Sequence, residues 1–199
     1  MLIMNRYRRD RALTYARRWA LDRNPLFTDF SGIGGNCTNF ASQCVLAGSC
    51  VMNYTPDFGW YYVSPEERAP AWSGVDYFYD FLTGAPTFEA RNGGIGPYAV
   101  EVPREAVEIG DVIQIAAEGD EWSHTMVVSA VREDGEILVC AHSVDSLDRP
   151  LSTYEYENVR YLHILGVRVE NDDTVCYEYL LRGGGDDVIT DDSDMIIEE

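Results

Sequence analysis

The order of hydrophobic patterns along the chain predicts an α+β fold in which N-terminal helices pack on an antiparallel β-sheet. In the first part, residues 7–22 and the segment that follows Cys37 place apolar side chains at helical spacing. From about residue 109 onward, apolar residues recur with a period of two, and Asp134-Gly135 separates two such runs as in a β-hairpin. Helices therefore precede strands, as in an α+β domain.

Each predicted helix has its own start or stop signal. The helix over residues 7–22 ends before an Asn-Pro pair, because the residue that precedes a proline disfavours helical backbone angles. The glycine-rich loop SGIGGN leads to Cys37, where a second helix begins, and Gly48 is its natural C-terminal cap. A third helix is expected from Gly74 to Leu82, followed by a surface loop rich in glycine and proline over residues 83–103.

The second half of the chain contains the predicted strands. They are VIQIAA, which follows Ile109-Gly110-Asp111, residues 124–132, ILVCAH and residues 160–169, with Thr174–Leu180 as a candidate for a last strand. We expect a single domain over residues 1–169. Residues 170–199 are expected to form an acidic C-terminal extension that ends in a solvated tail.

The acidic balance of the chain excludes one class of partner. Thirty-four Asp and Glu face 15 Lys and Arg, which gives a net charge of −19. A nucleic-acid partner is not expected, because phosphate binding needs clustered Lys and Arg. No apolar run reaches the roughly 18 residues that a membrane span requires. No secretory signal pattern is visible at the N-terminus, so we expect a cytoplasmic location.

The five cysteines do not form a recognisable framework. They include no CxxC pair, and their spacing matches neither a zinc site nor an obvious disulfide pattern. We therefore expect reduced thiols in a reducing compartment. No metal ion and no organic cofactor are predicted.

Cys37 is a candidate nucleophile because of its local position. The N-terminus of a helix presents unpaired N–H groups and about half a positive charge, which favours a thiolate over a thiol. The same amides can stabilise a developing oxyanion. The alternative is a buried structural cysteine, which is the usual fate of an unpaired cysteine.

A cysteine nucleophile needs an imidazole within hydrogen-bonding reach. His124 begins a predicted strand, and His142 ends the strand that pairs with it across the hairpin. If the register places both rings on one face, His142 can set the tautomer of His124, and Asp145 is the competing residue for that orienting role. His163, inside an apolar run, is expected to be structural.

Several segments together resemble a known family. GGNCTNFASQCVLAG, IGDVIQI, WSHTMVV, AHSVDSLDRPLSTY and VRYLHI resemble, in this order, the putative amidase domain family of bacteria. That family is related to the CHAP and NlpC-type cysteine amidases and peptidases of the papain-like superfamily. The resemblance covers roughly residues 5–167 and implies a papain-like (NlpC/CHAP-type) fold.

The resemblance also implies roles for individual residues. Cys37 matches the nucleophile, His124 the base and His142 the third, orienting polar residue. Asn36 stands where many relatives carry Asp. By this resemblance the chain is a cysteine hydrolase in which the Cys37 thiolate attacks an amide carbonyl and forms a thioester that water then cleaves.

The expected substrate is a peptide, a peptidoglycan stem peptide or another small molecule that contains an amide. With this net charge, a neutral or cationic ligand is easier to accommodate than a polyanion. Two alternatives remain open. One is an acyltransferase that uses the same cysteine and histidine, and the other is a non-catalytic binding module on the same fold.

Overall fold

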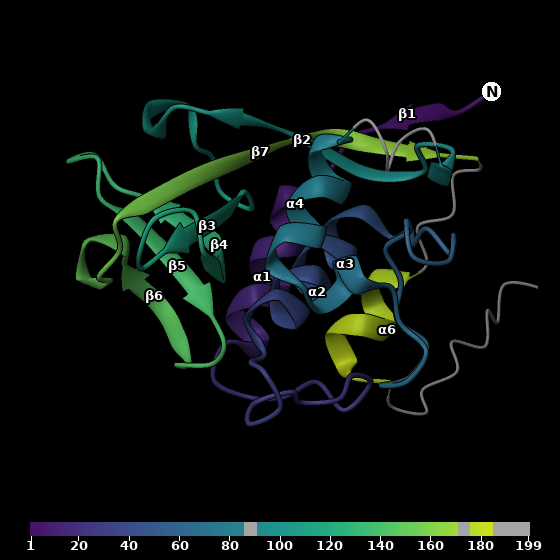
Figure 1. Cartoon of the computed structure of the whole chain (residues 1–199), viewed down its shortest axis with the longest axis horizontal. Coiled ribbons are helices and arrows are strands. Elements are labelled where there is room, and N and C mark those ends of the chain that lie inside the picture. Colours follow the sequence, from purple (N-terminus) through teal and green to yellow (C-terminus); the bar gives the residue numbers. More distant parts are fainter. Residues whose placement is uncertain (86–90, 171–175, 185–199) are drawn as a thin grey trace, which may run out of the picture.

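The computed structural model describes residues 1–85, 91–170 and 176–184 and shows an α+β fold (Figure 1). Within these residues, seven strands form one antiparallel sheet in the order β1-β7-β3-β4-β5-β6, and β2 also pairs with β7. The strands are β1 (Ile3–Asn5), β2 (Gly96–Val102), β3 (Val112–Ala116), β4 (Trp122–Val131), β5 (Ile137–Ala141), β6 (Ser146–Pro150) and β7 (Asn158–Val169). The α+β prediction with an antiparallel sheet is confirmed.

The helices of the described part group together beside the sheet (Figure 1). They are α1 (Arg9–Trp19), α2 (Cys37–Ser49), α3 (Pro70–Ser73), α4 (Val75–Thr83) and α6 (Cys176–Arg182), with short 3-10 turns at Arg104–Ala106 and Leu151–Thr153. None of the helices in the described ranges is long and apolar enough to cross a membrane.

Helix α2 lies at the centre of the helical layer. It packs against α1, α3, α6 and β4, and every residue from Cys37 to Gly48 is buried. A side chain at Gly48 would place its Cβ 2.3 Å from the Tyr7 ring, so glycine permits this close approach. Because α2 is covered on several sides, its first residue is held in a fixed place beside β4.

The central strands are buried on both faces, and this matters for the site. Val112 of β3 and Val127 of β4 belong to the core shared with the helices. Ile113, Met126 and Val139 belong to a second core on the opposite face. Since successive side chains of a strand point to opposite faces, neighbouring residues of β4 belong to different cores.

The C-terminal part differs from the prediction of a last strand. Residues 176–182 form helix α6, while Thr174 lies outside the described residues, as do the tail residues 185–199. The buried Leu180 anchors α6 in the helical core, and the helix packs against α1 and α2. The segment lacks a strand partner, so burial of one helical face decides its conformation.

The expected loop over residues 83–103 also contains a strand. Its second part forms β2, which pairs with β7 from Gly96 to Val102. Pro97 is tolerated there because β2 is at the edge of the sheet and pairs with β7. The N–H group that proline lacks is therefore not needed for pairing with a strand on the other side. The glycine and proline content of this segment therefore concealed an edge strand.

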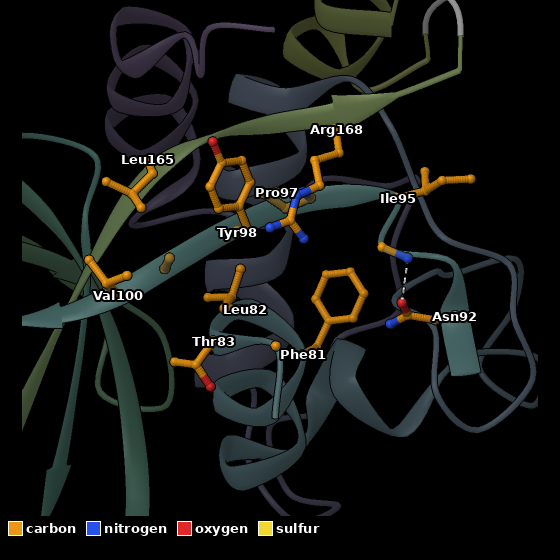
Figure 2. Close-up of a pocket in the computed structure, with 13 residues that line it drawn as sticks. Phe81, Leu82, Thr83, Asn92, Ile95, Pro97, Tyr98, Val100, Leu165 and Arg168 are labelled. Carbon is orange, nitrogen blue, oxygen red and sulfur yellow. Dashed lines mark hydrogen bonds between the residues drawn. The ribbon is translucent and has the colours of Figure 1, made fainter. Parts of the chain in front are cut away.

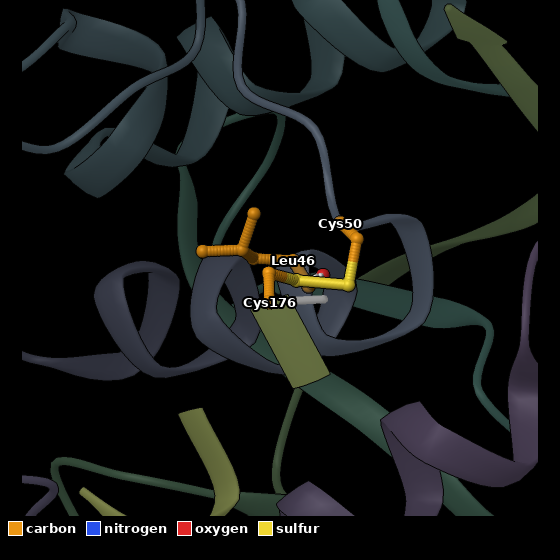
Figure 3. Close-up of a disulfide and its surroundings, with 3 residues drawn as sticks. All are labelled: Leu46, Cys50 and Cys176. Atoms are coloured by element: carbon orange, nitrogen blue, oxygen red, sulfur yellow. Dashed lines mark hydrogen bonds between the residues drawn. A yellow bond between two sulfur atoms is a disulfide. The ribbon is translucent and has the colours of Figure 1, made fainter. Parts of the chain in front are cut away.

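A disulfide joins Cys50 to Cys176, although the two residues are 126 positions apart (Figure 3). Cys50 is the left-handed C-cap of α2, and its N–H donates to the Leu46 carbonyl. The expectation that all five thiols are reduced is wrong, and the argument for a reducing compartment based on it no longer holds. Cys37, Cys44 and Cys140 remain free thiols, and all three are buried.

Candidate active site

Cys37 is the first residue of α2, where it meets the beginning of β4. Its side chain is free and 7% exposed. The Sγ atom lies 3.8 Å from the Thr38 hydroxyl and 3.9 Å from the Ser123 carbonyl oxygen. The Thr38 hydroxyl in turn makes a 2.9 Å hydrogen bond with that of Thr125. The helix start therefore lies directly against the strand that carries His124.

His124 nevertheless faces away from Cys37. In the register of β3 and β4, Ile115 pairs with His124 and Ile113 pairs with Met126. Directly paired residues share a face of the sheet, and these neighbours belong to the core opposite the helices. The His124 ring lies 5.8 Å from the Tyr154 ring, which packs on that same core.

A bulge at the beginning of β4 lies directly before His124. Ile115 pairs with His124, but Ala116 pairs with Trp122, so Ser123 is an extra residue in β4. Such an insertion changes which face the residues before it occupy relative to those after it. His124 continues the regular alternation of Thr125 and Met126 after the bulge, so its ring lies on the far face, while the Ser123 carbonyl lies next to Cys37.

The surroundings of His124 favour its neutral form. Burial, together with the nearby positive charge of Arg149, lowers the pKa of His124 to about 4. Its Nε2 atom is buried and makes no hydrogen bond with any residue in the described ranges. This ring is therefore desolvated without the partner that a catalytic base would require.

His142 lies on the helical side of the sheet, against Phe40 of α2 and next to Asn36, the residue before Cys37. Its Nδ1 is 2.8 Å from the Asn36 side-chain nitrogen, and its Nε2 is 2.8 Å from the Trp19 carbonyl oxygen. The ring stacks on Phe40 with centroids 4.0 Å apart. Burial is the main cause of a lowered pKa for His142, and the Arg23 charge adds to it.

The three predicted site residues are therefore only partly assembled. His142 is hydrogen bonded to Asn36, the residue before Cys37, whereas His124 is on the other face of the sheet. Among the residues that the structure describes, no hydrogen bond joins Cys37, His124 and His142 to one another. Asp145 forms a bidentate ion pair with Arg23 at 2.9 and 3.0 Å rather than contacting His124.

Sequence reasoning missed the buried polar residues that surround Cys37. Asn39 hydrogen bonds to Asn36 at 2.7 Å and to the Trp72 indole at 2.7 Å. Asn36 and Asn39 are three residues apart, a spacing that places helical side chains next to each other, so this signal was available. No such local signal indicates the contact between Asn39 and Trp72, which are 33 residues apart.

A second polar row leads away from the cysteine along the sheet. Thr125 contacts Gln114, whose side chain also binds the α4 backbone and the Arg160 guanidinium. That guanidinium lies 4.1 Å from the Trp122 ring centroid and 3.8 Å from that of Tyr79. These contacts fix the beginning of β4 relative to α4 and β7.

A cavity of about 220 Å³ lies elsewhere, between α4 and strands β2 and β7. Figure 2 shows Phe81, Tyr98 and Arg168 around it. None of the predicted site residues lines this cavity. No group of three or more His, Cys, Asp or Glu able to hold a metal ion occurs in the described part of the chain.

Comparison with known proteins identifies a family. The model of the putative amidase domain family matches residues 6–165, which confirms the resemblance. An uncharacterized protein of Bacillus subtilis (strain 168), YhbB, is 34% identical over 145 residues. The match covers 70% of this chain and 42% of YhbB, so the chain spans less than half of that relative. No solved structure matches, and the papain-like fold therefore stays a prediction.

Proposed function

The chain belongs to the putative amidase domain family, and from this premise we propose that it is a cysteine hydrolase with Cys37 as its nucleophile. At a coarse level, the family description supports a hydrolase that acts on amide bonds. The observation that carries the finer proposal is the place of Cys37. It is a free thiol at the first residue of a buried helix, next to the strand that carries His124.

The proposed chemistry follows from that place. The N-terminus of α2 offers N–H groups to the oxyanion that forms when the Cys37 thiolate attacks an amide carbonyl. His124 would protonate the departing amine, and water would then hydrolyse the thioester. We include in the proposal a papain-like arrangement, in which the helix of the nucleophile lies against an antiparallel sheet.

This chemistry requires His124 to reach the helical face of β4. Because side chains alternate along a strand, a shift of one residue at the Ser123 bulge would move His124 to that face. The Ser123 carbonyl, bonded to the His124 nitrogen, is already 3.9 Å from Sγ of Cys37, so the required movement is local. We propose that the free protein exchanges between the arrangement in the structure, which is the more populated, and the shifted one, and that substrate binding favours the shifted one.

Alkylation of Cys37 tests the proposed pair. Iodoacetamide labelling between pH 4 and pH 9, located by mass spectrometry, is compared among the wild type, His124→Ala and His163→Gln. The last variant removes a histidine on another strand, and the buried Cys44 and Cys140 serve as internal controls. Rapid labelling of Cys37 well below pH 8 that slows only in His124→Ala supports the pair.

Two results would contradict it. Labelling that follows an ordinary thiol near pH 8.5, or labelling that is indifferent to His124→Ala, leaves Cys37 without a thiolate–imidazole partner. In either case the assignment of His124 as base fails.

For the active protein, the proposed substrate is a neutral or cationic peptide or peptidoglycan stem peptide.

A binding module without catalysis is the second candidate, and a specific observation favours it. His124 faces the far side of the sheet, and both ring nitrogens of His142 already have hydrogen-bond partners. The two candidates differ in their response to Cys37→Ser. A hydrolase loses turnover of peptide or muropeptide substrates, whereas a binding module retains the affinity of the wild type and never releases a product.

A further inference from the structure

A directional chain of hydrogen bonds runs from Trp72 through Asn39 and Asn36 to His142. An indole nitrogen only donates, so Asn39 must present its oxygen to Trp72. The Asn39 amide nitrogen then donates to the Asn36 oxygen, and the Asn36 nitrogen is left to donate to Nδ1 of His142. The orientation of both amides is thus decided by the donor at one end.

The other end of the chain demands the same direction. Nε2 of His142 lies 2.8 Å from the carbonyl oxygen of Trp19, and a carbonyl only accepts. Nε2 must therefore carry the proton, which leaves Nδ1 of the neutral ring as an acceptor for Asn36. The Phe30 N–H confirms the direction, because it donates to the same Asn36 oxygen that accepts from Asn39.

Asn36 is also anchored through its backbone. Its side chain is 1% exposed, and its N–H donates to the Ser143 hydroxyl at 2.9 Å. Both its main chain and its side chain are therefore tied to the segment that follows β5. Because Asn36 is the N-cap of α2, these bonds locate the first helical residue, Cys37.

We propose that Asn36 is a positioning residue that holds Cys37 against the sheet by donating to the neutral, Nε2-protonated tautomer of His142. His142 then acts on Cys37 through Asn36 and not through His124. The importance of this role rests on Cys37 being the nucleophile, as proposed above. The tautomer itself does not depend on that function and can be measured without turnover.

The charged groups around His142 agree with a neutral ring. The Arg23 guanidinium lies 3.3 Å from Nε2 and opposes a second positive charge. Asp145 and Asp29 favour the charged form, but both pair with Arg23. On the other side, the ring stacks on the apolar Phe40. A carboxylate at position 36 would add a direct acceptor for Nδ1–H.

The test is nitrogen-15 NMR of the full chain labelled at histidine, from pH 5 to pH 8. The three histidines are assigned by their loss in single His→Gln variants. In the wild type, we expect the neutral His142 ring at pH 8 to carry its proton on Nε2 and not on Nδ1. In Asn36→Asp, the carboxylate accepts from Nδ1–H, so the ring should gain its second proton at a higher pH than in the wild type.

Trp72→Phe is the matched control, because it removes the donor at one end while the Trp19 carbonyl still selects the tautomer. We expect His142 to keep its wild-type signals in this variant. An Nδ1-protonated ring in the wild type, or a titration unmoved by Asn36→Asp, would overturn the proposal even if Cys37 proves to be catalytic.

A double-mutant cycle tests the link to Cys37. The readout is the alkylation rate of Cys37 at pH 9, where even a buried thiol reacts through local opening. Asn36→Ala and His142→Ala should be coupled, so that the double variant changes the rate no more than the larger single change. Additive effects would refute the link. A Cys37 that is alkylated only as an ordinary thiol near pH 8.5, together with the expected tautomer and coupling, would refute the proposed function alone.

Discussion

The orientation of His124 has a consequence for stability that can be measured directly. Burial lowers its pKa from 6.5 to about 4. The folded protein therefore binds this proton less tightly than the unfolded chain does. The contribution of neutral His124 to the free energy of unfolding is fully present above pH 6.5. It is lost as the pH falls toward 4, because protons then bind the unfolded state more tightly.

The size of the effect follows from the same shift. One pKa unit corresponds to about 1.4 kcal/mol, so between pH 7 and pH 5 His124 should cost the folded state about 2 kcal/mol. The assay is chemical denaturation at pH 7, 6 and 5 for the wild type and for His124→Gln, which cannot titrate. Other groups titrate alike in both proteins, so the difference between their unfolding free energies isolates His124.

The wild type should lose about 2 kcal/mol more than His124→Gln over this range. The opposite outcome is equally informative. An imidazolium paired with a Cys37 thiolate would have a raised pKa, and the wild type would gain stability relative to the variant as the pH falls toward 6.5. A gain, or no difference at all, would refute the placement of His124 on the far face in the resting protein.

Two further predictions concern the framework around the site. Asp111 is fully buried and accepts from Arg9 at 2.6 Å, from His163 at 2.9 Å and from two backbone N–H groups, so Asp111→Ala should cost about 3 to 5 kcal/mol of unfolding free energy. The exposed Asp10 is the control, and a comparable loss in Asp10→Ala would show that burial is not the cause. Reduction of the Cys50–Cys176 disulfide should cost about 2 to 4 kcal/mol. The chain unfolded without reductant should titrate three thiols, whereas five would contradict the disulfide.

Local signals were sufficient to predict much of the secondary structure. The helix expected to begin at Cys37 is α2, and the strands expected after Asp111 and from residue 160 are β3 and β7. These segments have strong periodicity and clear punctuation by glycine or proline. Where the partner decided the conformation, as in the edge strand β2 and the helix α6, local signals were not sufficient.

The sequence by itself determined that Cys37 begins a helix after a glycine-rich loop, because backbone freedom and helix capping are local properties. Only the tertiary structure decided which face His124 occupies. Both faces of β4 are buried, so its hydrophobic pattern does not favour one register over the other, and only the pairing with β3 sets the face of His124. The tertiary structure also decided two further contacts. Packing of the helices around α2 brings Trp72 to Asn39 and Cys176 to Cys50, which lie far apart in the sequence.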